Sequence, residues 1–275
     1  MRSAVRIFVV ICMNATVWLG WAPAADAWKN GPPDNKVTNS LDDCLEPPYA
    51  THDWVIDQAV SLLPETERQW LTDQRRFYLI GTEAPDYAKI MLACGVPHRG
   101  YNDTGRGRHD LRWASGFETP SRDTPARRAE EEYAKAVEAW KAGRADHAAF
   151  YLGAAAHYVG DLSQYGHNIS GESHHKDFEL WIATKTDGPR AAAFMAYIAA
   201  DGLQRRTAYD AVVATGRAVA EAGDGIIRPD DMDWLYGTDK KHSAAFHRSI
   251  GLSLNRSVNN LADVLHTFYI DVVKQ

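Results

Sequence analysis

The sequence lacks the features of disordered chains, of proteins that wrap nucleic acid and of membrane-embedded proteins. Proline and glycine, 12 and 20 of the 275 residues, are not in excess, so wholesale disorder is not expected. There is no block of basic residues and the formal net charge is −6, which argues against a protein that wraps duplex nucleic acid. No segment after residue 27 is long and apolar enough to span a bilayer. Because 45% of the residues are hydrophobic, the chain can instead build a sizeable core.

Residues 1–27 have the organisation of a secretory signal. Two arginines precede a mostly apolar stretch over 7–21, and residues 25–27 (Ala-Asp-Ala) form the small-x-small site at which signal peptidase cuts. The alternative is an uncleaved anchor, but the apolar stretch is short for a membrane span. We therefore expect a secreted or periplasmic protein whose first mature residue is Trp28.

Cysteine is scarce, with three residues in the whole chain and no Cys-x-x-Cys pair. Cys12 would leave with the signal segment, so that Cys44 and Cys94 remain. An even number of cysteines in an exported protein favours a disulfide. Two free thiols, or zinc ligands, are the alternatives.

Helical patterns fill most of the remaining chain. Thr51 can cap a helix that begins at His52, and Thr124-Pro125 begins a helix that runs to residue 142, where Gly143 ends it. Further helices are predicted over 146–162, 177–184, 190–200, 203–222 and 243–273. Alternating strand patterns are scarce, repeats are absent, and 28–48 and 94–124 resemble an extended arm and a long loop. The prediction is an all-α fold, with one compact multi-helix domain over 28–275.

Histidines and acidic residues concentrate between residues 149 and 181. His157 and Asp161 are four residues apart within a helical pattern, so both side chains leave one face of the helix. His175 and Glu179 repeat this spacing on the next helix, and His167 lies between the two pairs. Imidazole nitrogens and carboxylate oxygens that converge within about 2.0–2.2 Å of one point are what zinc requires. The pattern therefore predicts a metal site.

Each pair taken alone has an ordinary alternative, because a single helical histidine is more often packed or solvated than a ligand. His174 is a second candidate beside His175. It has Phe178 rather than an acid four residues later, so the spacing favours His175.

The segment over 149–164, AFYLGAAAHYVGDLSQ, resembles the zinc-binding helix of bacterial zinc-dependent phospholipases C. The S1/P1-type nucleases share that metal arrangement. Further matches occur in the same order along the chain: a mature N-terminal tryptophan at Trp28, a ligand helix over 52–59 that begins with His52, the pair Asp86-Tyr87, and a loop histidine at His109.

The resemblance implies an all-α fold of the phospholipase C and P1 nuclease type, with up to three zinc ions. The implied ligand sets are Asp86, His109, His157 and Asp161; His167, His175 and Glu179; and the α-amino group and carbonyl of Trp28 with His52 and a shared Asp161. An α-amino group has a pKa of about 8, so zinc can displace its proton at neutral pH. Removal of the signal would create that ligand, which couples maturation of the site to export.

The implied reaction is hydrolysis of the glycerol-side phosphodiester bond of phospholipids to diacylglycerol and a phosphorylated headgroup. Asp86 would be both a metal ligand and the candidate general base, and Tyr87 would line the headgroup pocket. The expected partner is phospholipid at a membrane surface, with no stable nucleic-acid partner, and the expected state is a monomer. The chain shows no additional C-terminal β-rich module, so it is expected to be a minimal catalytic domain.

Three features favour lipid over nucleic acid: Glu179 in place of the aspartate usual in the related nucleases, His52 on a helix well after Trp28, and Tyr87. Gly31 stands where choline-preferring relatives carry a glutamate, so a preference for choline is not predicted. An S1/P1-type nuclease acting on single-stranded nucleic acid is one alternative. A non-enzymatic helical protein with structural zinc is the other, although the set of His167, His175 and Glu179 has one ligand fewer than a closed structural site.

Overall fold

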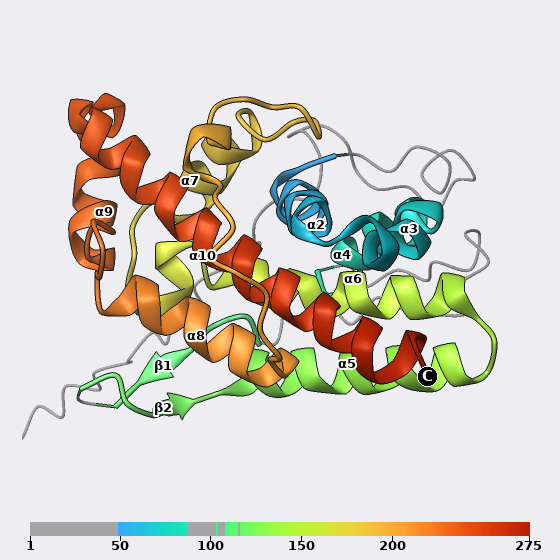
Figure 1. Cartoon of the computed structure of the whole chain (residues 1–275). Helices are drawn as coiled ribbons and strands as arrows, with labels where there is room; N and C mark the ends of the chain where they lie inside the picture. The colour runs from blue at the N-terminus through green and yellow to red at the C-terminus, as the bar shows by residue number, and fades with distance from the viewer. Residues whose placement is uncertain (1–48, 87–102, 104–107, 115) are drawn as a thin grey trace, which may run out of the picture.

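The computed structural model describes residues 49–86, 103, 108–114 and 116–275, and most of them are helical (Figure 1). The predicted signal segment 1–27 and the arm over 28–48 lie outside these ranges. The α-helices are α2 (Thr51–Leu62), α3 (Glu65–Asp73), α4 (Arg75–Glu83), α5 (Thr124–Lys141), α6 (Ala145–Asp161), α7 (His175–Ala183), α8 (Ala208–Ala220), α9 (Pro229–Tyr236) and α10 (Ala244–Phe268). The shorter elements are the 3-10 turns η3 (Tyr165–Asn168), η4 (Met195–Tyr197) and η5 (Asp239–His242), the π-helical turn η6 (Tyr269–Val273), and the antiparallel strands β1 (Arg112–Trp113) and β2 (Pro120–Arg122). The predicted all-α class is confirmed.

Helix α6 is the centre of the fold. It pairs with α5 through a tight turn at Gly143, whose φ of 73° is in the left-handed region that glycine tolerates. It also packs against α4 and contacts α2, α8 and α10, while α10 crosses the bundle as the long helix in Figure 1. Residues 147–161 are all buried except Tyr151. A helix enclosed on nearly all sides explains why this segment carries few exposed charges.

Two predicted helices agree closely with the structure. The helix predicted over 124–142 is α5, with Pro125 in its first turn, and the helix predicted over 146–162 is α6. The segment predicted over 243–273 is α10 followed by the π-helical turn η6. Within the described ranges, no helix combines the length and the hydrophobicity that crossing a membrane requires.

The predicted capping role of Thr51 is wrong. Ala50 occupies the N-cap of α2, and the carboxylate of Asp53 accepts the N–H of Ala50 at 3.0 Å. The Thr51 hydroxyl lies 2.9 Å from that of Thr186, in a buried contact between α2 and the segment after α7. A carboxylate in the first turn therefore satisfies the helix terminus and leaves the threonine for tertiary packing.

The helix predicted over 190–200 does not form, and α8 begins at Ala208 rather than at 203. The chain instead runs beside α10, whose side chains one turn apart accept its backbone N–H groups. The four contacts are Ala199 to Asn255 (3.0 Å), Asp201 to Asn259 (3.1 Å), Gln204 to Asp263 (2.8 Å) and Arg206 to Thr267 (2.8 Å). These contacts bind residues 199–206 to α10, at the end of the helix predicted over 190–200 and the start of the one predicted over 203–222, so a tertiary partner takes up N–H groups that a local helix would have used.

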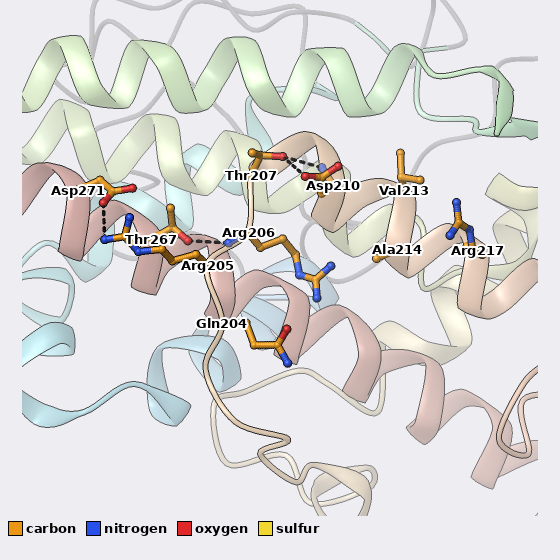
Figure 2. A pocket seen from close by; sticks show the side chains of 10 residues that line it. All are labelled: Gln204, Arg205, Arg206, Thr207, Asp210, Val213, Ala214, Arg217, Thr267 and Asp271. Atoms are coloured by element: carbon orange, nitrogen blue, oxygen red, sulfur yellow. Dashed lines mark hydrogen bonds and ion pairs between the residues drawn. The ribbon is translucent and has the colours of Figure 1, made fainter. Parts of the chain in front are cut away.

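A cavity of about 550 Å³ lies where this segment meets α8 and α10 (Figure 2). Its three arginines are each engaged by an acceptor: Arg205 by Asp271 at 2.9 Å, Arg206 by Asp263 at 3.0 Å and Arg217 by the carbonyl of Glu118 at 2.6 Å. The cavity is lined by none of the histidines that the sequence singled out. Those histidines gather at another place in the fold.

Candidate metal centre

The structure brings eight of the predicted ligands into one cluster. They come from α2 (His52), the turn after α4 (Asp86), the loop before β1 (His109), α6 (His157 and Asp161), η3 (His167) and α7 (His175 and Glu179). Three groups have ligand atoms within 4.8 Å of one another: His52, His157 and Asp161; Asp86, His109 and His157; and His167, His175 and Glu179. The remaining predicted site residues, Trp28, Tyr87, Cys44 and Cys94, lie outside the described residues, so their roles stay predictions.

Asp161 joins the groups. The spacing of one helical turn places it beside His157, whose Nε2 is 3.3 Å from Asp161 Oδ2. The other oxygen, Oδ1, is 3.3 Å from His52 Nε2 and 3.8 Å from His167 Nε2. His52 also stacks on His157, with 3.9 Å between the ring centroids. A single fully buried carboxylate therefore faces histidines from α2, α6 and η3.

Asp86 and His109 complete one side of the cluster. His109 Nδ1 is 2.6 Å from Asp161 Oδ2. Asp86 Oδ1 is 3.6 Å from both His109 Nε2 and His157 Nε2. The side chain of Asp86 is 13% exposed whereas that of Asp161 is fully buried, so Asp86 is the carboxylate that solvent reaches on this side.

The third group adjoins the others through Asp161. His175 Nε2 is 2.8 Å and His167 Nε2 is 3.6 Å from Glu179 Oε1. His174, the alternative considered above, packs its ring against Tyr236 of α9 at a centroid distance of 5.6 Å. The spacing rule that favoured His175 agrees with this geometry.

Three histidines are held from behind, through the ring nitrogen that faces away from the cluster. The acceptors are the carbonyl of Thr82 for His157 Nδ1 (2.6 Å), Asp110 Oδ1 for His167 Nδ1 (3.2 Å) and Glu172 Oε1 for His175 Nδ1 (2.7 Å). Such contacts fix the ring orientation and leave Nε2 as the coordinating atom, as is usual around metal-binding histidines. The sequence pattern did not reveal these supports. The acids close to the ligands, Asp110 and Glu172, are the signal that could have suggested two of them.

The cluster shifts the pKa values of its members strongly. Burial, with the neighbouring His157, lowers the pKa of His52 to about 3, so this imidazole is neutral, the form that binds a metal. Burial alone would also lower the pKa of His157, but Asp161 and Asp86 raise it to about 9. Burial alone would raise the pKa of Asp161, but His157 and the other histidines around it hold it well below its usual range. The Asp161 carboxylate is therefore ionised and can neutralise a cation.

The residues fit zinc. Ligands about 2.0–2.2 Å from a tetrahedral zinc ion are roughly 3.3–3.6 Å from one another. Several of the nitrogen–oxygen distances given above are 3.3–3.6 Å. Six buried atoms of the cluster residues have no hydrogen-bond partner among the described residues, and five of them lie on its inner side: His52 Nε2, Asp161 Oδ1, His167 Nε2, His175 Nε2 and Glu179 Oε2; the sixth is His52 Nδ1, which faces Gly160. Buried polar atoms are normally satisfied, and coordination of a cation would satisfy these.

Gly160 of α6 provides the space that His52 occupies. A Cβ at this position would lie 2.7 Å from His52 Nδ1. A helical glycine-to-alanine change usually stabilises by about 1 kcal/mol. We expect Gly160→Ala to displace His52 instead and to weaken zinc binding at the His52 group roughly 10–100-fold. Titration with a competing chelator measures this. Gly188→Ala, where a Cβ meets nothing within 4 Å, is the control. Equal zinc affinity of the two variants would contradict the prediction.

Comparison with known proteins follows the same residues. A family model described as zinc-dependent phospholipase C matches residues 51–208, the span that holds all eight residues of the cluster. The fold is similar to that of the alpha-toxin of Clostridium perfringens from avian strain SWCP, with a TM-score of 0.53 and 18% sequence identity over 82% of this chain and 64% of the toxin. The alpha toxin of Clostridium absonum gives a TM-score of 0.48 and 14% identity over 81% of this chain and 64% of the toxin. The chain thus spans less than two thirds of the length of these toxins. No curated protein matches the sequence.

Proposed function

Because the chain belongs to the zinc-dependent phospholipase C family, we propose that it is a secreted phosphodiesterase that acts on phospholipids at a membrane surface. It hydrolyses the glycerol-side phosphodiester bond and releases diacylglycerol and a phosphorylated headgroup. Residues 1–27 are the export signal, and 28–275 form one catalytic domain that works as a monomer without a nucleic-acid partner. The observation that supports this best is the buried cluster in which three groups of histidines and carboxylates meet at Asp161.

We assign up to three zinc ions to this cluster. One is held by Asp86, His109, His157 and Asp161, and one by His167, His175 and Glu179. The third is held by His52, Asp161 and the amino terminus and carbonyl of Trp28 after removal of the signal. When bound, zinc supplies positive charge for the phosphodiester and activates water at neutral pH.

The protein's own side chains orient the reaction. The side chain of Asp86 is more exposed than that of Asp161, so Asp86 is the residue placed to accept the proton of an attacking water. The Thr82 carbonyl accepts a hydrogen bond from His157 Nδ1. This contact keeps His157 Nε2 directed toward Asp86 and Asp161. Tyr87 follows Asp86 in the chain and is the proposed contact for the lipid headgroup.

The test is hydrolysis by the protein produced from the full 275-residue chain through an export pathway, with its N-terminus sequenced. Vesicles of phosphatidylcholine or phosphatidylethanolamine, and single-stranded DNA, are offered in parallel. We expect release of phosphorylated headgroup that stops on chelation, returns with zinc and falls at least roughly a thousandfold in His157→Ala. His242→Ala, which changes an exposed histidine outside the cluster, is the matched control and should keep full activity.

Other outcomes assign the protein differently. Cleavage of DNA without lipid hydrolysis would make it a nuclease of the S1/P1 type. Tight zinc binding without hydrolysis of any diester would make the metal structural. A processed N-terminus other than Trp28, in an active enzyme, would remove Trp28 from the ligand set.

A further inference from the structure

Helix α9 follows the span that the family model matches; it packs against η3, and its Tyr236 contacts α7. Its Asp233 carboxylate accepts three donors through Oδ1: the Tyr165 hydroxyl at 3.0 Å and the N–H groups of Ser173 and His174, each at 3.1 Å. Oδ2 accepts the Ser173 N–H as well, at 3.0 Å. One side chain of α9 thus binds both ends of the segment between η3 and α7.

The Asp233 contacts lie at the N-terminus of α7. His174 is the N-cap residue of α7, and its side chain makes no capping hydrogen bond. The first N–H groups of a helix need acceptors, and a carboxylate at this end also interacts favourably with the helix dipole. From a neighbouring helix, 59 and 60 residues further along the chain, the carboxylate of Asp233 accepts the N–H of the N-cap residue His174 and that of Ser173 before it.

The residues that Asp233 binds lie within two residues of two of the proposed zinc ligands. His175 is the first residue of α7, directly after the N-cap, and His167 lies in η3, which begins at Tyr165. The segment between them includes Ser170, Gly171 and Ser173, which are exposed, so Asp233 adds to the hold that Ile169 and Glu172 provide. A second contact from α9, the Tyr236 hydroxyl to the carbonyl of Asp177 at 2.7 Å, holds the same turn of α7.

We propose that Asp233 is a positioning residue for the zinc ion of the His167, His175 and Glu179 group. It fixes the start of α7 relative to η3, and with it the approach of His175 Nε2 and His167 Nε2 to Glu179. The same contacts keep His174 against α9 and away from the cluster. The inference rests on the proposed zinc-dependent function, because it assigns the role to the metal of that site.

The experiment compares zinc binding by the full-chain protein and three variants. Zinc content and affinity are measured by competition with a chromophoric chelator. We expect Asp233→Ala to weaken one of the three zinc ions roughly 10–100-fold and to leave the other two unchanged. Asp233→Asn keeps an oxygen in the place of Oδ1 and should retain most of the affinity. Asp231→Ala removes an exposed acid from the same helix and should match the unchanged protein.

The results separate the two proposals. If the unchanged protein binds no zinc, the proposed function fails and the inference with it. If it binds zinc but Asp233→Ala has the same content and affinity, the inference alone is overturned. A uniform loss of all zinc with a lower melting temperature would show a general structural role and would also overturn it. Selective loss of one ion in Asp233→Ala, restored in Asp233→Asn, supports it.

Discussion

Asp161→Asn is expected to reduce phospholipid hydrolysis at least roughly a thousandfold and to remove more than one zinc ion. The carboxylate is fully buried, with one oxygen 3.3 Å from His52 Nε2 and the other 3.3 Å from His157 Nε2. An amide replaces one of these oxygens with an NH₂ group, which cannot coordinate a cation. It also removes a negative charge from the position that the proposed zinc ions would share. A thousandfold fall in rate corresponds to a loss of several kcal/mol of transition-state stabilisation.

The measurement pairs initial rates on phosphatidylcholine vesicles with zinc content. Asp187→Asn, the same chemical change at an exposed position, is the control and should behave like the unchanged protein. If Asp161→Asn keeps three zinc ions and at least a tenth of the rate, Asp161 is not the shared ligand. Loss of a single ion would confine its role to one of the groups.

Local pattern was sufficient for the helices that carry their own boundary signals. Helix α5 begins at Thr124 with proline in its first turn and is followed by Gly143, so both ends were predictable. The segment over 190–200 is equally rich in helix-forming residues, yet it forms no α-helix, and side chains of α10 accept the N–H of Ala199 at its end and of Asp201 just beyond it. Those acceptors are more than 50 residues away, so a local pattern contains no trace of them.

The same division applies to the candidate metal centre. The spacing of one helical turn was sufficient to pair His157 with Asp161 and His175 with Glu179, because it depends on helix geometry alone. The placement of His52 and Asp86 came only from the resemblance to phospholipases C. The groups that hold the ligand rings from behind, such as the Thr82 carbonyl, were not predicted, because their contacts depend on how separate helices pack.

Gly153→Ala is expected to cause the largest loss of stability. A Cβ at this position would lie 2.1 Å from the carbonyl oxygen of Tyr78, and a Cβ at Gly81 would lie 2.1 Å from that of Phe150. Helices α4 and α6 thus touch through their backbones, and neither backbone can yield as a flexible side chain would. The usual gain of about 1 kcal/mol for alanine in a helix is therefore reversed. We expect destabilisation by about 3 kcal/mol and a melting temperature about 6–12 °C lower.

Urea unfolding of the metal-free protein measures the effect on the fold alone, with Gly223→Ala as the control, since a Cβ there meets nothing within 4 Å. Equal unfolding free energies for the two variants would show that the helices separate without cost. The contact between α4 and α6 also sets the position of the Thr82 carbonyl, one residue after Gly81, against His157 Nδ1. Gly153→Ala should therefore weaken zinc binding even where the protein remains folded, because the spacing that closes the core also aligns the ligand.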